Sequence, residues 1–182
     1  MKVDHVLILA AGKGTRMGEV GKVIPKVIWP IYELSLLELE VLYAKELAPE
    51  AKIYINLYYK SELILKHIKE SEILRDINLI IEKEKLDIGG AVHNMARNEN
   101  YTGNLLILNS DQFLYFNSEL FKNALEELVF SDGVLFTYNV NSDDGYNALD
   151  IDELVLKGIV LNKDISKNTK IRTYTGMSLI KL

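Results

Sequence analysis

Hydrophobic and polar positions alternate between two patterns along most of the chain. Short, nearly continuous apolar runs, typical of strands buried on both faces, are separated by longer segments whose apolar residues recur at helical spacing. The expected strands span residues 3–11, 52–58, 79–82, 105–108 and 133–140, and the expected helices span 35–47, 61–70, a segment opened by Gly89-Gly90, and 118–130. Ser35 is expected to cap its helix, because serine is favoured at that position.

The last part of the chain lacks helical spacing. Apolar residues at 148–151, 154–161 and 172–180 predict strands joined by short polar turns. The whole pattern predicts an α/β fold, with a mostly parallel sheet covered by helices on both faces and a small antiparallel β addition. No repeat or linker interrupts it, so we expect a single domain over residues 1–182.

Composition narrows the function classes. The chain is 48% hydrophobic and 26% charged, as in ordinary globular proteins, and its net charge of −5 argues against a broad surface for nucleic acid. It has no cysteine, which excludes disulfides, thiolate metal sites and a cysteine nucleophile. It shows no secretory signal and no apolar stretch near the roughly 20 residues that cross a bilayer. We therefore expect a cytoplasmic protein without nucleic-acid or membrane partners.

The most informative segment lies where the first expected strand meets a glycine-rich loop. Residues 9–17 read LAAGKGTRM, and Pro25-Lys26 follows downstream. Glycines let backbone N–H groups approach an anion closely, and the cations Arg16 and Lys26 can share its charge. An idle turn would need neither cation. The pattern therefore indicates a site for the phosphates of a nucleotide.

Two other phosphate-binding motifs do not fit this loop. The dinucleotide fingerprint G-x-G-x-x-G would need glycine where Met17 stands. The P-loop pattern G-x-x-x-x-G-K-[ST] would need glycine where Arg16 stands and serine or threonine where Val23 stands. A third type of phosphate loop must account for the pattern.

Residues 10–17 together with Pro25-Lys26 resemble the signature of nucleotidyltransferases acting on sugar 1-phosphates, which include NDP-sugar pyrophosphorylases and mannose- or heptose-1-phosphate guanylyltransferases. The cytidylyltransferases of isoprenoid synthesis have a shorter gap than the ten residues from Arg16 to Lys26. The guanylyltransferases of molybdenum-cofactor synthesis lack the Pro-Lys pair. The resemblance implies a three-layer, Rossmann-like sheet of the nucleotide-diphospho-sugar transferase type.

Later segments resemble the same family in the same order. Residues 82–91, EKEKLDIGGA, are similar to the family's segment along the nucleobase, with Asp87 and Ile88 in place of the usual Gly-Thr. Asn109-Ser110-Asp111 resembles the family's Asn-Gly-Asp, whose aspartate binds Mg²⁺. Thr175-Gly176 resembles the strand that passes beneath the sugar. The Gly-Gly-Ala run favours guanylyl transfer.

The resemblance implies that a sugar 1-phosphate attacks a nucleoside triphosphate, giving an NDP-sugar and pyrophosphate. Arg16 and Lys26 would be the catalytic cations, and Asp111 would bind the Mg²⁺ cofactor. Lys163, Thr175 and Gly176 would contact the sugar phosphate, although Asn162 replaces a customary glutamate beside Lys163. The implied nucleotide-binding residues are Leu9, Ala10, Ala11, Gly12, Gly14, Thr15, Glu82, Gly89 and Gly90.

The chain departs from the family at its end. It stops at Leu182, before the place of the family's second metal-binding aspartate, so we expect a C-terminally short member. Asp150, Asp152 and Asp164 are candidates to replace that carboxylate, but each is more typical of a turn. Two alternatives stay open: a non-catalytic, regulatory relative that binds a nucleotide or NDP-sugar, and an incomplete form of a longer enzyme. Apolar surface left uncovered would favour a homo-oligomer.

Overall fold

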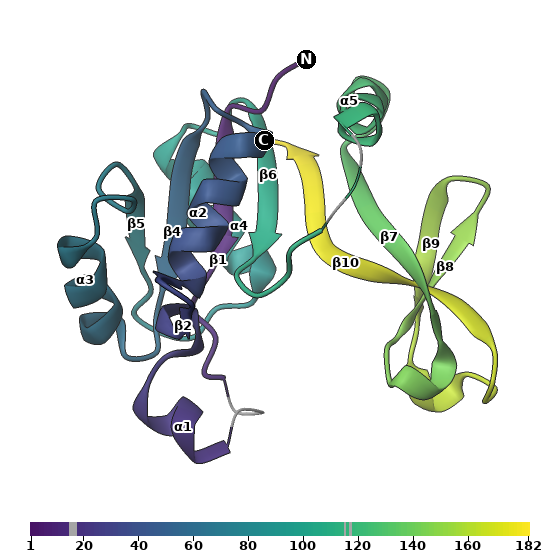
Figure 1. Cartoon of the computed structure of the whole chain (residues 1–182). Helices are drawn as coiled ribbons and strands as arrows, with labels where there is room; N and C mark the ends of the chain where they lie inside the picture. The colour runs from purple at the N-terminus through teal and green to yellow at the C-terminus, as the bar shows by residue number, and fades with distance from the viewer. Residues whose placement is uncertain (15–17, 115, 117) are drawn as a thin grey trace. The chain divides into compact units, whose positions relative to one another are not determined.

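The computed structural model describes residues 1–14, 18–114, 116 and 118–182 (Figure 1). The chain divides into two compact units, one formed by residues 1–134 with 178–182 and the other by residues 135–177. Single-domain behaviour stays a prediction. Among the described residues, no helix combines the length and the apolar character that crossing a bilayer requires.

A parallel sheet forms the centre of the first unit, as the apolar runs predict. Strands β1 (His5–Leu9), β4 (Lys52–Leu57), β5 (Asn78–Ile81) and β6 (Asn104–Asn109) pair in parallel in the order β5-β4-β1-β6. Beyond β6, strands β10 (Lys170–Lys181) and β7 (Gly133–Asn141) extend the order and run on into the second unit. The central strand β1 is buried except for its last residue.

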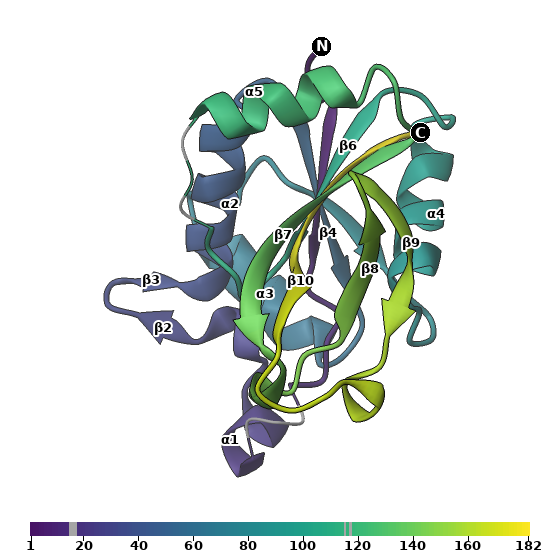
Figure 2. The ribbon, with the colours of Figure 1, turned by 90° about the vertical axis from the view of Figure 1, so that its right-hand side faces the viewer.

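Helices cover both faces of this sheet. Helices α2 (Leu36–Leu47) and α4 (Ile88–Asn98) lie on opposite sides of the strands (Figure 2). Helices α3 (Ser61–Glu70) and α5 (Ser118–Glu127) complete the set of longer helices among the described residues. Between the sheet and α4, buried Leu7, Leu105 and Met95 belong to one apolar cluster. The predicted α/β architecture with helices on both faces is confirmed.

The start of α2 is held by a capping box. The Ser35 hydroxyl accepts a hydrogen bond from the Glu38 backbone N–H at 3.2 Å, and the Ser35 N–H donates to the Glu38 carboxylate at 2.7 Å. Two orphan donors of the helix terminus are thereby satisfied, so the predicted cap is confirmed. Helix α4 begins at Ile88, one residue before the predicted Gly89, and Asp87 is its cap.

Replacing Ser35 with alanine is expected to lower the free energy of unfolding by about 1 kcal/mol, because the cap oxygen is lost. Ser61, the first residue of α3, provides the matched control, since no side chain caps that helix. Urea unfolding curves of the two variants measure the difference. Equal losses for Ser35→Ala and Ser61→Ala would contradict the role of the capping box.

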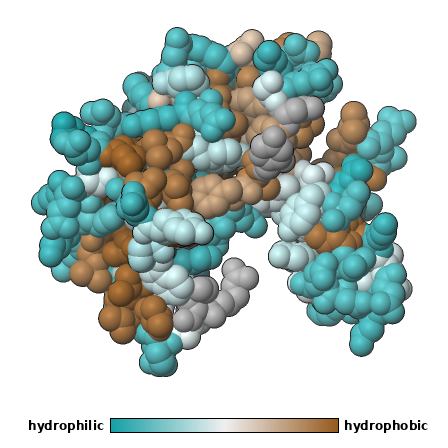
Figure 3. All heavy atoms as spheres, in the orientation of Figure 1, coloured by the Kyte–Doolittle hydropathy of each residue, from teal (hydrophilic) through white to brown (hydrophobic). Residues whose placement is uncertain are grey.

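Several short elements between residues 18 and 35 are absent from the prediction. They are α1 (Gly18–Val23), the 3₁₀ turn η2 (Lys26–Ile28) and a hairpin of β2 (Pro30–Ile31) and β3 (Leu34–Ser35). Such elements are too short for a periodic pattern to develop. Figure 3 shows apolar side chains over α1, where Val20, Val23 and Ile24 are exposed. The expected homo-oligomer stays a prediction.

The second unit contains the predicted antiparallel addition. Strands β8 (Ala148–Asp152) and β9 (Val155–Val160) form an antiparallel hairpin, and 3₁₀ turns η3 (Ser142–Asp144) and η4 (Asn162–Asp164) flank it in the chain. Glu153 has a φ of 55° in the hairpin turn. Strand β9 therefore begins at Val155 rather than at residue 154, because the chain reverses there.

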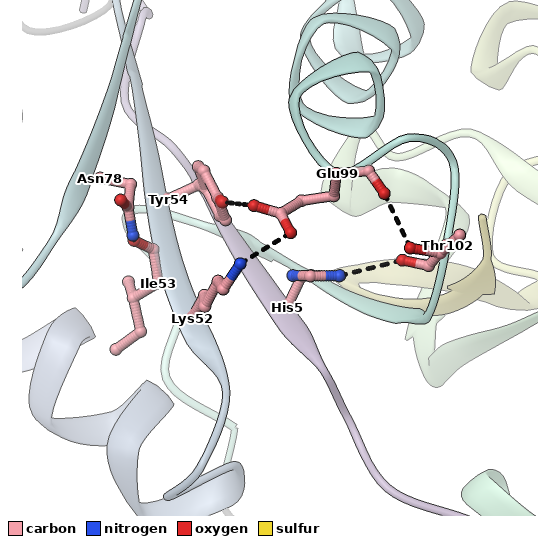
Figure 4. A network of polar contacts seen from close by, with 7 residues as sticks. All are labelled: His5, Lys52, Ile53, Tyr54, Asn78, Glu99 and Thr102. Carbon is pink, nitrogen blue, oxygen red and sulfur yellow. Dashed lines mark hydrogen bonds and ion pairs between the residues drawn. The ribbon is translucent and has the colours of Figure 1, made fainter.

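A polar cluster lies at the amino ends of the strands in the first unit (Figure 4). Glu99 pairs with Lys52 at 2.8 Å and accepts a hydrogen bond from the Tyr54 hydroxyl, and these contacts lower the pKa of Glu99. The imidazole Nε2 of His5 lies 3.0 Å from the Thr102 carbonyl oxygen. The cluster joins β1, β4 and the end of α4 at the edge opposite to the glycine-rich loop.

Candidate active site

Two residues far apart in sequence meet at the carboxyl edge of the sheet. Lys26 follows the loop after β1, and Asp111 follows β6, the neighbouring parallel strand. The Lys26 ammonium lies 2.6 Å from a carboxylate oxygen of Asp111, and both side chains are 31% exposed. A partly exposed ion pair stabilises a fold by about 1 kcal/mol at most. The pair matters for function, because it holds a cation and a carboxylate together at the edge where α/β sheets bind ligands.

The glycine-rich loop begins directly after β1. Ala10 and Ala11 are buried, whereas Gly12 faces open space, since a Cβ at that position would meet no atom within 4 Å. Gly14 has a φ of 58°, a backbone conformation that glycine adopts without strain. Thr15 and Arg16 lie outside the described residues. Their assigned contacts with the nucleotide therefore stay predictions.

A cavity of about 210 Å³ opens beside this loop. One side is formed by Leu9, Ala11 and Gly12, the other by residues 85–88, and Asn56 and Asn109 also line it. All of these segments come from the carboxyl ends of parallel strands or from the segment before α4. The cavity is smaller than the roughly 300–1,000 Å³ typical of pockets that enclose a ligand, which suits partial enclosure of a larger molecule.

A buried hydrogen-bond relay underlies this cavity. The Ala10 N–H donates to the Asn56 side-chain oxygen at 2.8 Å, and the Asn56 amide donates to Glu82 at 2.8 Å. The second Glu82 oxygen accepts from the Leu86 N–H at 3.3 Å. Both oxygens of Glu82 are therefore engaged inside the protein. Asn56 is not among the predicted site residues, because its only signal in the sequence is a polar residue inside the apolar run KIYINL.

The two glycines assigned to nucleotide binding lie in the first turn of α4. The Gly90 N–H donates to the Asp87 carboxylate at 2.8 Å, which satisfies one orphan donor of the helix. A Cβ at Gly90 would approach the Leu86 side chain to 3.0 Å. Gly90 therefore permits close packing of the helix start against the segment that lines the cavity, and contact of Gly89 and Gly90 with a nucleotide stays a prediction.

A second residue without a sequence signal is Glu40 of α2. It is fully buried, and neither of its carboxylate oxygens has a hydrogen-bond partner among the described residues. Burial raises the pKa of Glu40 to about 8, the nearby Gln112 backbone N–H opposes this increase, and the Asp111 charge adds to it. A buried glutamate with a raised pKa thus lies close to the turn that carries Asp111.

The predicted sugar-phosphate residues lie in the second unit. Lys163 lines a depression of about 590 Å³ together with Asp143 and Lys167. The side-chain amide of Asn162 donates a hydrogen bond to the Ser142 carbonyl oxygen at 2.7 Å, and both residues line this depression.

On the strand assigned to the sugar, Thr175 is buried and donates its hydroxyl to the Phe136 carbonyl at 2.9 Å, while Gly176 has a φ of 88°. The sugar contacts of both residues stay predictions. Asp150 and Asp152 lie within β8, although turns were expected. Among the described residues, no group of three or more His, Asp or Glu side chains could hold a metal ion.

Comparisons with known proteins agree with this arrangement. The chain is 33% identical over 152 residues to the D-glycero-alpha-D-manno-heptose 1-phosphate guanylyltransferase of Campylobacter jejuni, covering 82% of this chain and 64% of that relative. It is 26% identical to the bifunctional protein GlmU of Synechococcus sp. strain CC9311, covering 96% of this chain and 37% of that relative. The chain thus spans less than two thirds of the length of these relatives.

Solved structures show the same fold. The crystal structure of HddC from Yersinia pseudotuberculosis matches with a TM-score of 0.79 and 25% identity, covering 98% of this chain and 76% of HddC. A structure of UDP-glucose pyrophosphorylase complexed with UDP-glucose matches with a TM-score of 0.75 at 16% identity, over 98% of this chain and 76% of that one. The family model described as Nucleotidyl transferase matches residues 5–154. With most of its length covered by that match, the chain belongs to the nucleotidyl transferase family.

Proposed function

We propose that this protein transfers a nucleotidyl group, guanylyl in preference to others, from a nucleoside triphosphate to a hexose or heptose 1-phosphate. The contact of Lys26 with Asp111 carries the proposal, because it places a cation and a carboxylate at the edge of the sheet where β1 and β6 end and the glycine-rich loop begins. The guanylyl preference is supported by the Campylobacter relative and by HddC, which was crystallised in complex with GMP-PN.

The reaction requires little covalent chemistry from the side chains of the protein. An oxygen of the sugar phosphate forms a bond to the α-phosphorus, and the bond from that phosphorus to the departing pyrophosphate breaks. The attacking oxygen is already ionised, so no general base is needed. Alignment and positive charge are what the site must supply. Lys26 provides such a charge as a compact ammonium, and Arg16 is proposed to bind the departing pyrophosphate with its planar guanidinium.

Asp111 fits a magnesium ion. Its side chain is partly exposed, it carries hard oxygen ligands, and Mg²⁺ in phosphoryl-transfer sites is commonly held by one or two carboxylates together with substrate phosphates. When bound, the ion would neutralise charge on the phosphate oxygens. The second carboxylate of the family pattern is not assigned, and one carboxylate is sufficient for this mode of binding.

Release of pyrophosphate tests the proposal. The protein, produced as its gene encodes it, is incubated with each nucleoside triphosphate in turn and with mannose 1-phosphate or a heptose 1-phosphate, with and without Mg²⁺. We expect pyrophosphate release only when nucleotide, sugar phosphate and metal are all present, with GTP preferred. Calorimetric binding of nucleotide without turnover would instead support the non-catalytic, regulatory alternative. Absence of both binding and turnover would contradict a nucleotide site altogether.

A further inference from the structure

The relay beneath the cavity is more than a local contact, because it joins segments from separate parts of the chain. Asn56 is the second-last residue of β4, Ala10 begins the glycine-rich loop after β1, and Glu82 follows β5. Asn56 is 4% exposed and Glu82 is 5% exposed. Water therefore competes little for these hydrogen bonds, and each one is costly to leave unmade.

With asparagine at position 56 and glutamate at position 82, the hydrogen bonds of the relay can run in only one direction. Ala10 presents an N–H group, so the side-chain oxygen of Asn56 must face it. The amide nitrogen of Asn56 then faces Glu82, which must accept. The other Glu82 oxygen faces the Leu86 N–H, which also requires an acceptor. This amide and this carboxylate together satisfy every donor and acceptor of the relay.

The ends of the relay are the two walls of the cavity. Ala10 lies between Leu9 and Ala11, which line one wall, and Leu86 belongs to the opposite wall. Asn56, which itself lines the cavity, and Glu82, which does not, bridge these walls through their side chains. The distance between the loop and the segment before α4 is therefore fixed by side-chain hydrogen bonds, in addition to the pairing of the strands.

We propose that Asn56 and Glu82 are positioning residues that set the separation of the cavity walls, and thereby the affinity for the nucleoside triphosphate. This inference rests on the proposed function, in which the cavity beside the glycine-rich loop receives the nucleotide. Neither residue needs to touch the nucleotide for this role. The inference also assigns Glu82 a task different from direct contact with the base.

An exchange of the two side-chain types tests the relay. Asn56→Asp places a second carboxylate against Glu82, and Glu82→Gln turns one acceptor into a donor. Combined, N56D/E82Q restores every hydrogen bond with the direction of the central one reversed. The carboxylate introduced at position 56 accepts from the Ala10 N–H and from the amide introduced at position 82, whose oxygen accepts from the Leu86 N–H. Net charge is unchanged in the double variant.

Asn78 provides the matched control. It is an asparagine at the start of β5, and its side chain donates to the Ile53 carbonyl at 3.2 Å, near the opposite edge of the same strands (Figure 4). Asn78→Asp also replaces an asparagine with an aspartate and also removes one side-chain hydrogen bond, but it does so away from the cavity. It reports the general cost of such a change without disturbing the relay.

Binding of GTP is measured by calorimetry, together with the KM for each substrate. We expect N56D to raise the Kd for GTP about tenfold or more, since one buried hydrogen bond is worth about that factor. We expect E82Q to raise it several-fold, and the double variant to return to within about threefold of the wild type. The KM for the nucleotide should rise, while that for the sugar phosphate should not, a split that loss of folded protein would not produce.

Hydrogen exchange at the Ala10 and Leu86 amides separates failure of this inference from failure of the proposed function. If the wild type binds GTP and the single variants bind equally well, or the double variant is no better than N56D, the positioning role is refuted. If the wild type binds no nucleotide, the proposed function and the effect on affinity both fail. Faster exchange at both amides in N56D, restored in the double variant, would then support only the bridging of the walls; unchanged exchange would refute that as well.

Discussion

Replacing Lys26 with alanine is expected to lower kcat/KM for nucleotidyl transfer at least about 100-fold, equivalent to about 2.7 kcal/mol of transition-state stabilisation. The physical reason is the loss of a fixed positive charge beside the loop, where negative charge develops on the phosphate oxygens. Initial rates of pyrophosphate release at saturating and subsaturating substrate measure the loss. Because the charge acts mainly in the transition state, we expect kcat to fall more than substrate binding weakens.

Lys22 serves as the matched control for this variant. It is an exposed lysine four residues earlier, and its ammonium pairs only with Glu19 of the same short helix among the described contacts, at 2.6 Å. Lys22→Ala should retain nearly full activity. The contact of Lys26 with Asp111 leads to a further expectation. The loss of transition-state stabilisation in the double variant K26A/D111N should be smaller than the sum of the losses in the two single variants. Full activity in K26A would contradict the proposed role.

Replacing Glu40 with glutamine is expected to remove a large pH dependence from the free energy of unfolding. The pKa of Glu40 is raised from 4.5 to about 8 by burial, so the folded state keeps the carboxyl protonated over a range in which the unfolded state ionises. The unfolded state then binds fewer protons, and stability falls as pH rises from about 4.5 towards 8. Below 4.5 both states are protonated and this loss is absent.

The size of the effect follows from the shift. A pKa raised from 4.5 to about 8 corresponds to a loss of up to about 5 kcal/mol in the free energy of unfolding between these two pH values, at about 1.4 kcal/mol for each pH unit. Urea unfolding at pH 5 and pH 8 should show wild type losing much more stability than E40Q, so that E40Q is the more stable protein at pH 8. A parallel pH dependence in both proteins would contradict the assignment.

Glu38 in the same helix is the control of opposite sign. Burial acts to raise its pKa, but hydrogen bonds from Ser71 and from Ser35 outweigh burial and lower the pKa. Its ionised form therefore favours the folded state, and that contribution is lost as the pH falls through its folded pKa. E38Q should lose stability at neutral pH, whereas E40Q should gain it. Two glutamates two positions apart thus act in opposite directions, because hydrogen bonds outweigh burial at Glu38 and burial outweighs them at Glu40.

Features that depend on neighbouring residues could be predicted from the order of amino acids alone. The succession of apolar runs and helical segments was enough to predict the parallel sheet, and Ser35 marked the start of α2. The spacing of glycines, Arg16 and Lys26 was enough to indicate the family. These signals are local, because strand burial, helix capping and loop conformation are each encoded within a few residues.

Which distant side chains meet depends on how the strands and helices pack, and this emerged from the folded structure. Lys26 and Asp111 are 85 positions apart, and they touch because parallel neighbours β1 and β6 end at the same edge. In the sequence, Asn56 and Glu82 are ordinary polar residues near strand ends, and only the pairing of β4 with β5 brings them together. Glu40 resembles any other charged residue of a helix, and only the packing of α2 against the sheet buries it. Such contacts depend on register and packing between elements, which no local pattern encodes.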